Sequence, residues 1–120
     1  MQFKDWEELK RLCPITNGAW NKEFLYEYLV QSCNQNFSKQ IEAFFLKYRN
    51  DERLADLLFS FLLDNDYDGS DSQMGAAYFI SKMDKQLLKG KKELLLKAQK
   101  NEVHWKRPFP HDEHLEWFEK

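Results

Sequence analysis

Apolar side chains recur every three or four residues along most of this chain, and that period favours helices over strands. The clearest case carries five apolar side chains on one helix face: Leu54, Leu57, Leu58, Phe61 and Leu62. No run longer than three residues alternates between apolar and polar side chains as a strand would. The 120 residues include only 4 glycines and 3 prolines, few for the turns of an all-β sandwich or barrel. We therefore predict an all-α fold.

Breaks in the apolar period divide the chain into seven helical segments. The predicted helices are 3–12, 20–33, 38–48, 54–62, 71–83, 91–100 and 111–119. Pro14 ends the first because proline cannot donate the helical hydrogen bond, and Gly90 marks the break before the sixth. Candidate N-caps are Ser38 for the third helix, Asn50 or Asp51 for the fourth, and Asp71 or Ser72 for the fifth. We expect a compact stack of about three helical hairpins, forming a single domain over 1–120.

Charge is laid out in blocks, although the net charge of the chain is only −2. Between Asp51 and Asp71 there are seven acids and one base, Arg53, whereas Lys82–Arg107 holds nine bases and three acids. The segment 111–120 is acidic again. Such blocks determine which partners a protein attracts better than its total charge does.

The most polar segment, 64–71, joins the fourth and fifth predicted helices. Asp64, Asp66, Asp68 and Gly69 match the first half of a calcium-binding loop, but position twelve, which needs a bidentate glutamate, is Gly75. The segment can also be a solvated acidic turn. A third reading is a recognition patch for a basic partner, in which Asp64, Asp66, Asp68 and Asp71 contribute charge and Tyr67 an aromatic contact. We predict no bound metal.

Motifs for nucleophilic catalysis, for phosphate binding and for dinucleotide binding are all missing from the sequence. Cys13 and Cys33 lack the spacing of a zinc site, and the pair His111 and His114 is a weak metal signal without a third ligand. We therefore predict a protein that is not an enzyme and holds no cofactor.

Four tryptophans are many for this length. Trp6 and Trp20 fit the apolar stripes of the first two predicted helices and are expected in the core. Trp105 and Trp117 lie in a polar, histidine-containing region, where they either close the fold or anchor a partner, as tryptophan often does at interfaces.

The stretch 54–83 resembles a HEAT-type repeat. A leucine-rich first helix is followed by an aspartate-containing turn and a second helix that opens with Gly75-Ala76-Ala77, small residues that allow close approach of a neighbour. The turn is longer and more acidic than in that pattern, and the basic residue at the head of the second helix is missing. The resemblance covers about thirty residues and implies a helical, HEAT-like architecture.

The N-terminus has no basic region followed by an apolar run, and no segment reaches the roughly 20 apolar residues of a membrane helix. A cytoplasmic protein without a membrane segment is expected.

In size, charge pattern, aromatic content and HEAT-like hairpin, the chain resembles the immunity proteins of bacterial contact-dependent growth inhibition systems. That resemblance implies a protein that binds a cognate toxin, expected to be a basic nuclease, and covers its active site. The partner-binding residues would be Asp64, Asp66, Tyr67, Asp68, Asp71, Trp105 and Trp117. Two alternatives stay open: a HEAT-like scaffold with an endogenous partner, and a nucleic-acid-binding protein using Lys82–Arg107, which the acidic pI of about 5.9 disfavours.

Overall fold

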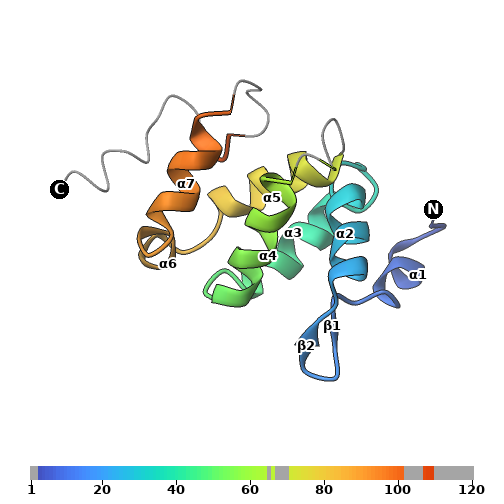
Figure 1. Cartoon of the computed structure of the whole chain (residues 1–120). Coiled ribbons are helices and arrows are strands. Elements are labelled where there is room, and N and C mark those ends of the chain that lie inside the picture. The colour runs from blue at the N-terminus through green and yellow to red at the C-terminus, as the bar shows by residue number, and fades with distance from the viewer. Residues whose placement is uncertain (1–2, 65, 67–70, 102–106, 110–120) are drawn as a thin grey trace.

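Seven helices and one two-stranded hairpin form the part of the chain that the computed structural model describes, residues 3–64, 66, 71–101 and 107–109 (Figure 1). The helices are α1 (Trp6–Lys10), α2 (Lys22–Gln31), α3 (Ser38–Lys47), α4 (Glu52–Leu62), α5 (Asp71–Ser81), α6 (Lys85–Lys89) and α7 (Lys92–Gln99). The strands are β1 (Ile15–Thr16) and β2 (Ala19–Trp20). In these ranges, no helix is both long and apolar enough to pass through a bilayer.

The hairpin corrects the prediction of an all-α fold. Its strands are antiparallel, with Thr16 opposite Ala19 across a two-residue turn. That turn consists of Asn17 and Gly18, whose φ angles of 53° and 77° are both left-handed. Asn-Gly suits such a turn because both residues adopt positive φ at low cost. Trp20 therefore lies on a strand, and the second helix begins only at Lys22.

Side-chain caps explain where some helices begin. Asp51 caps α4, as predicted, by accepting a hydrogen bond from the backbone N–H of Leu54 at 3.0 Å. The predictions for Ser38, Asp71 and Ser72 are wrong: α3 begins at Ser38 without a side-chain cap, and Asp71 and Ser72 already belong to α5.

The region after α5 also differs from the prediction. The helix predicted at 71–83 ends at Ser81, and the separate helix α6 precedes the predicted break. The carboxylate of Asp84 accepts a hydrogen bond from the N–H of Gln86 at 2.8 Å and so caps α6. Gly90 ends α6, which confirms the break. The helix predicted at 111–119 lies outside the described residues.

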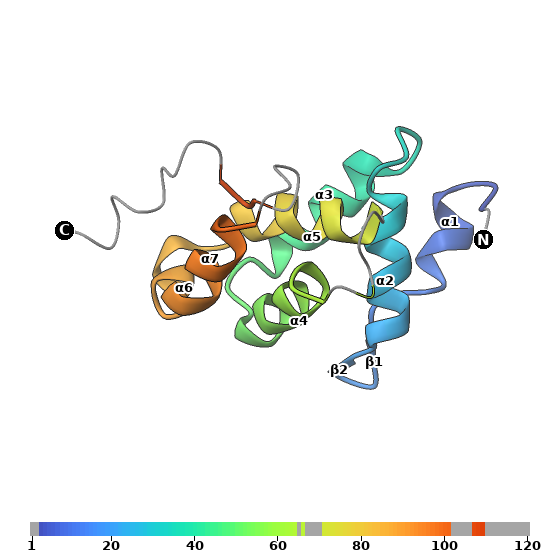
Figure 2. The ribbon, with the colours of Figure 1, turned by 45° about the horizontal axis from the view of Figure 1, so that its top comes forward.

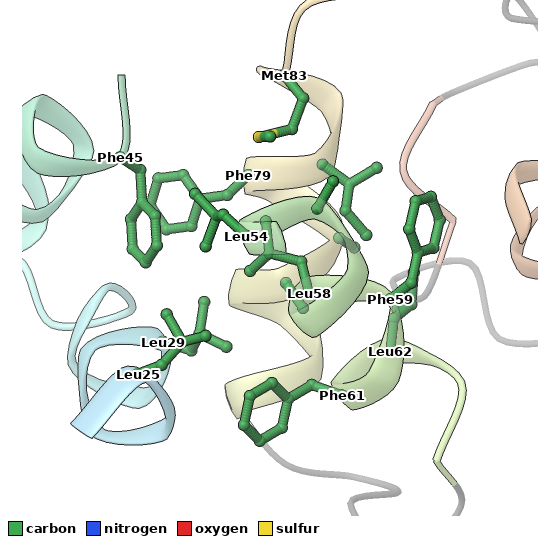
Figure 3. Packing of buried hydrophobic residues seen from close by; sticks show 14 of the residues in the cluster. Leu25, Leu29, Phe45, Leu54, Leu58, Phe59, Phe61, Leu62, Phe79 and Met83 are labelled. Atoms are coloured by element: carbon green, nitrogen blue, oxygen red, sulfur yellow. The ribbon is translucent and has the colours of Figure 1, made fainter. Parts of the chain in front are cut away.

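Helix α5 is the centre of the packing. It packs most extensively against α4 and next against α2, while α3 lies along another side (Figure 2). The rings of Phe45 on α3 and Phe79 on α5 are stacked, with centroids 4.1 Å apart. Figure 3 shows leucines of α2 and α4, among them Leu29 and Leu58, pointing into the same space. Burial of these side chains supplies the main driving force for folding.

The two N-terminal tryptophans pack against this core but are only partly buried. The Trp6 ring lies 5.8 Å from that of Tyr28. Trp20 packs edge-on against Tyr48, and its indole Nε1 donates to Oδ2 of Asp51 at 3.2 Å. Asp51 therefore joins the hairpin to the start of α4.

The Tyr28 phenol makes the stability of the fold depend on pH in the alkaline range. Burial, with a smaller contribution from Cys13, raises the pKa of this phenol from 10.0 to about 12. Because the folded state favours the protonated phenol, this group stabilises the fold below pH 10. The stabilisation is lost as the pH rises through 12. Between those pH values, we expect the free energy of unfolding to fall by roughly 2 kcal/mol more in the wild type than in Tyr28→Phe. Urea denaturation at both pH values measures this difference, and equal losses in the two proteins would contradict it.

Candidate partner-binding site

The structure divides the described acids of the segment 51–71 into two groups. The first group is neutralised or used within the fold. Asp51 caps α4, and the ammonium of Lys91 lies 2.7 Å from Oδ1 of Asp56 and 3.0 Å from Oε1 of Glu52. Hydrogen bonds to Asp56 first and then to Glu52 raise the pKa of Lys91, so its positive charge is already matched.

The second group comprises Asp64, Asp66 and Asp71. Asp64 is half-buried, and its Oδ1 accepts a hydrogen bond from the backbone N–H of Asp66 at 2.9 Å. Asp66 and Asp71 are exposed. No lysine, arginine or histidine in the described ranges forms an ion pair with any of the three. Within the described residues, their charge is therefore not neutralised by an ion pair.

Gln73 fixes the point where the chain leaves α4 toward these acids. Its side chain is completely buried, and its amide Nε2 donates to three backbone carbonyls: Phe61 at 3.3 Å, Leu62 at 3.3 Å and Asp64 at 2.9 Å. The last carbonyls of a helix have no intrahelical donor. One side-chain amide on α5 thus satisfies the end of α4 and holds the backbone at Asp64.

An exposed stripe continues from Asp71 along α5. Met74 and Tyr78 follow at helical spacing, and each is 46% exposed. Both side chains are of types that usually pack inward, but here neither is buried. Gly75 and Ala76, by contrast, are buried on the side of α5 that packs against the rest of the fold.

A groove of about 630 Å³ borders this stripe. The end of α2, helix α3, helix α5 and the segment 107–108 line it, with Cys33, Glu42, Met74, Tyr78, Arg107 and Pro108 among its residues. The hydroxyl of Tyr78 donates to Oε1 of Glu42 at 2.6 Å, and this hydrogen bond is the main cause of a raised pKa for Tyr78.

Cys33 connects the groove to Asp71. Its thiol donates to the backbone carbonyl of Asp71 at 3.7 Å. Burial first, and then the Asp71 carboxylate, raises the pKa of this thiol, which favours the unreactive protonated form.

Four residues that the sequence predicts for the site lie outside the described residues: Tyr67, Asp68, Trp105 and Trp117. Arg107, two positions after Trp105, lines the groove. In the described ranges, no three histidine, cysteine, aspartate or glutamate side chains gather as metal ligands. The sequence missed Glu42, Met74 and Tyr78 as candidate site residues.

No protein-family model matches the chain, and no similar protein was found among curated sequences or solved structures.

Proposed function

We propose that this protein is an immunity protein that binds a basic protein toxin and covers its active site. The observation that carries the proposal is the surface along α5 and just before it. Asp71, Met74 and Tyr78 follow one another along α5 beside the groove, and Asp64 and Asp66 precede this helix. None of these three acids forms an ion pair with a cation of the described residues. The proposal implies a cytoplasmic protein with no catalytic activity and no cofactor.

The mechanism has two parts. Carboxylates at the end of α4 and the start of α5 would take the place of substrate phosphates and attract lysines or arginines of the toxin. Complementary charge of this kind speeds encounter and determines specificity. Met74 and Tyr78 would then lose water in the complex, and buried aromatic contacts of this kind slow dissociation. Tyr67, Trp105 and Trp117 are further proposed anchors.

Co-expression with the product of the neighbouring gene tests the proposal. We expect that product to reduce host viability when expressed alone and to form a stoichiometric complex with the tagged protein that restores viability. A neighbouring product that is harmless alone, or a toxic one that neither binds nor is neutralised, would refute it.

Charge reversal in the acidic segment should slow association with the toxin. We expect Asp66→Lys with Asp68→Lys to lower the association rate constant about tenfold in about 0.1 M salt, because long-range attraction becomes repulsion. In about 1 M salt, where the Debye length is about 3 Å, most of the difference should vanish. Stopped-flow mixing measures both rates.

A matched control makes the same change of charge elsewhere. Glu7 in α1 and Glu93 in α7 are both exposed. Glu7 precedes the acidic segment in the sequence, and Glu93 follows it. If Glu7→Lys with Glu93→Lys slows association as much as the first variant does, net charge alone accounts for the effect. The acidic segment would then not belong to the interface.

A HEAT-like scaffold with an endogenous partner is the second candidate. The extensive packing of α4 on α5, with small residues of α5 against α2, favours such a helical arrangement. A stable complex with a partner that is not toxic would support it. The nucleic-acid alternative has less support, because Lys91 of the basic segment already pairs with two acids. It predicts steeply salt-dependent binding to any duplex.

A further inference from the structure

We infer that the groove between α3 and α5 receives a lysine or arginine side chain of the partner, with Glu42 as its counter-ion and Tyr78 as the residue that positions the Glu42 carboxylate. The inference rests on the proposed function, since it names the part of the partner that this surface takes. It concerns a place on α3 that is separate from the acidic segment 64–71.

Glu42 is a half-buried carboxylate on the wall of the groove. Its Oε1 accepts the hydrogen bond from Tyr78 at 2.6 Å, which holds the group in one orientation. No cation in the described part of the chain forms an ion pair with it, in contrast to Glu52 and Asp56. A partly desolvated carboxylate favours a positive partner, and a charge-assisted hydrogen bond to its second oxygen would satisfy it.

The other walls suit the aliphatic stem of a long basic side chain. Met74, Ala77 and Pro108 are apolar, and the groove is of the size that takes a small ligand. Lysine and arginine bury their methylene groups against such surfaces while their charged ends reach a polar group. Asp71 lies on the same stripe of α5 as Met74. A basic segment of the partner laid along α5 would therefore contact both Glu42 and Asp71.

Among the described cations, Arg107 lines the groove and Lys82 contacts the ring of Tyr78, a groove residue. Nζ of Lys82 lies 5.3 Å from the centroid of the Tyr78 ring, which shows that this ring accepts a cation on its face. Nε of Arg107 donates to the backbone carbonyl of Asn101 at 3.0 Å, at the end of α7. Neither forms an ion pair with Glu42, so within the described residues the Glu42 carboxylate has no cationic partner.

The first test uses a capped Ala-Arg-Ala tripeptide and the same peptide with neutral citrulline in place of arginine. We expect the arginine peptide to shift the NMR signals of the Met74 methyl and the Tyr78 ring saturably, and the citrulline peptide to bind about fivefold more weakly. Glu42→Gln should weaken binding of the arginine peptide by a similar factor, whereas Glu93→Gln should leave this binding unchanged. Absent shifts, equal binding of the two peptides, or shifts confined to Asp66 and Asp71 would overturn the inference.

A second test uses the complex with the toxin and separates this inference from the proposed function. Glu42→Gln should raise the dissociation rate constant about fivefold and leave the association rate nearly unchanged, because it removes one short-range contact. Tyr78→Phe should have a smaller effect in the same direction. If the toxin is bound and neutralised but Glu42→Gln dissociates like the wild type, the groove inference fails while the proposed function stands.

Discussion

The substitution Gly75→Val is expected to lower the free energy of unfolding by about 3 kcal/mol or more. A Cβ atom on Gly75 would lie 2.7 Å from the backbone carbonyl oxygen of Leu29 and 2.8 Å from Oγ of Ser32. The first of these atoms belongs to the backbone of α2 and cannot move alone. Helices α2 and α5 would therefore have to separate, and the buried side chains between them would lose their packing. Chemical denaturation followed by circular dichroism measures the change.

Two further variants isolate this cause. Gly75→Ala adds only the Cβ atom, so its gain in helix propensity of about 1 kcal/mol opposes the clash and the loss should be smaller than for valine. Gly90→Ala is the control, because a Cβ there would lie 3.4 Å from the nearest atom, the Leu87 carbonyl oxygen, an ordinary contact. We expect Gly90→Ala to change stability little. Wild-type stability in Gly75→Val would show that α2 and α5 do not pack this closely.

The helices of the centre were predictable because their local signals agree with their packing. In α4 the apolar period, the Asp51 cap and burial on α5 all specify the same helix. The close approach at Gly75 was likewise expected from the run of small residues. The prediction failed where local signals were short. The five residues of α6 carry few periodic positions, and Asp84 was the only sign of its start.

The sequence contains a hairpin signal, but the helical spacing of the neighbouring apolar residues outweighs it. Asn17-Gly18 is the dipeptide of a two-residue hairpin turn, yet its strands have only two residues each and show no alternation. Trp20 also fits the apolar stripe of α2 at helical spacing, which extends the predicted helix by two residues. Pairing of Trp20 with Ile15 makes it a strand residue, and its contacts with Tyr48 and Asp51, both distant in sequence, hold its side chain against the fold.

For the candidate site, the sequence supplied the acids but not their roles. Counting charges cannot show that Lys91 neutralises Glu52 and Asp56, because the pairs form between residues far apart in the chain. Hydropathy likewise does not indicate that Met74 and Tyr78 are exposed. They are exposed because Gly75 faces α2, which leaves Met74 and Tyr78 on another side of α5. Which side of α5 faces α2 is decided only when the helices pack.

Replacing Gln73 by alanine is expected to lower the free energy of unfolding by roughly 2–4 kcal/mol. The side chain is fully buried, and its amide is a donor to the carbonyls of Phe61, Leu62 and Asp64. Alanine leaves these acceptors without that donor and leaves a cavity. In the described residues, Oε1 of Gln73 has no hydrogen-bond partner, so the loss comes from the donor side. Urea denaturation measures the change in stability.

Gln73→Met separates the hydrogen bonds from the volume, since methionine fills similar space without a donor. We expect it to cost roughly 1–3 kcal/mol, and the exposed substitution Gln86→Met less than about 0.5 kcal/mol. The same variant connects stability to the proposed function. Without the amide the backbone at Asp64 is held less firmly, so amide exchange at Asp66 should accelerate and association with a basic partner should slow, even where the protein stays fully folded. Unchanged exchange at Asp66 would show that Gln73 stabilises α4 without positioning the acids that follow it.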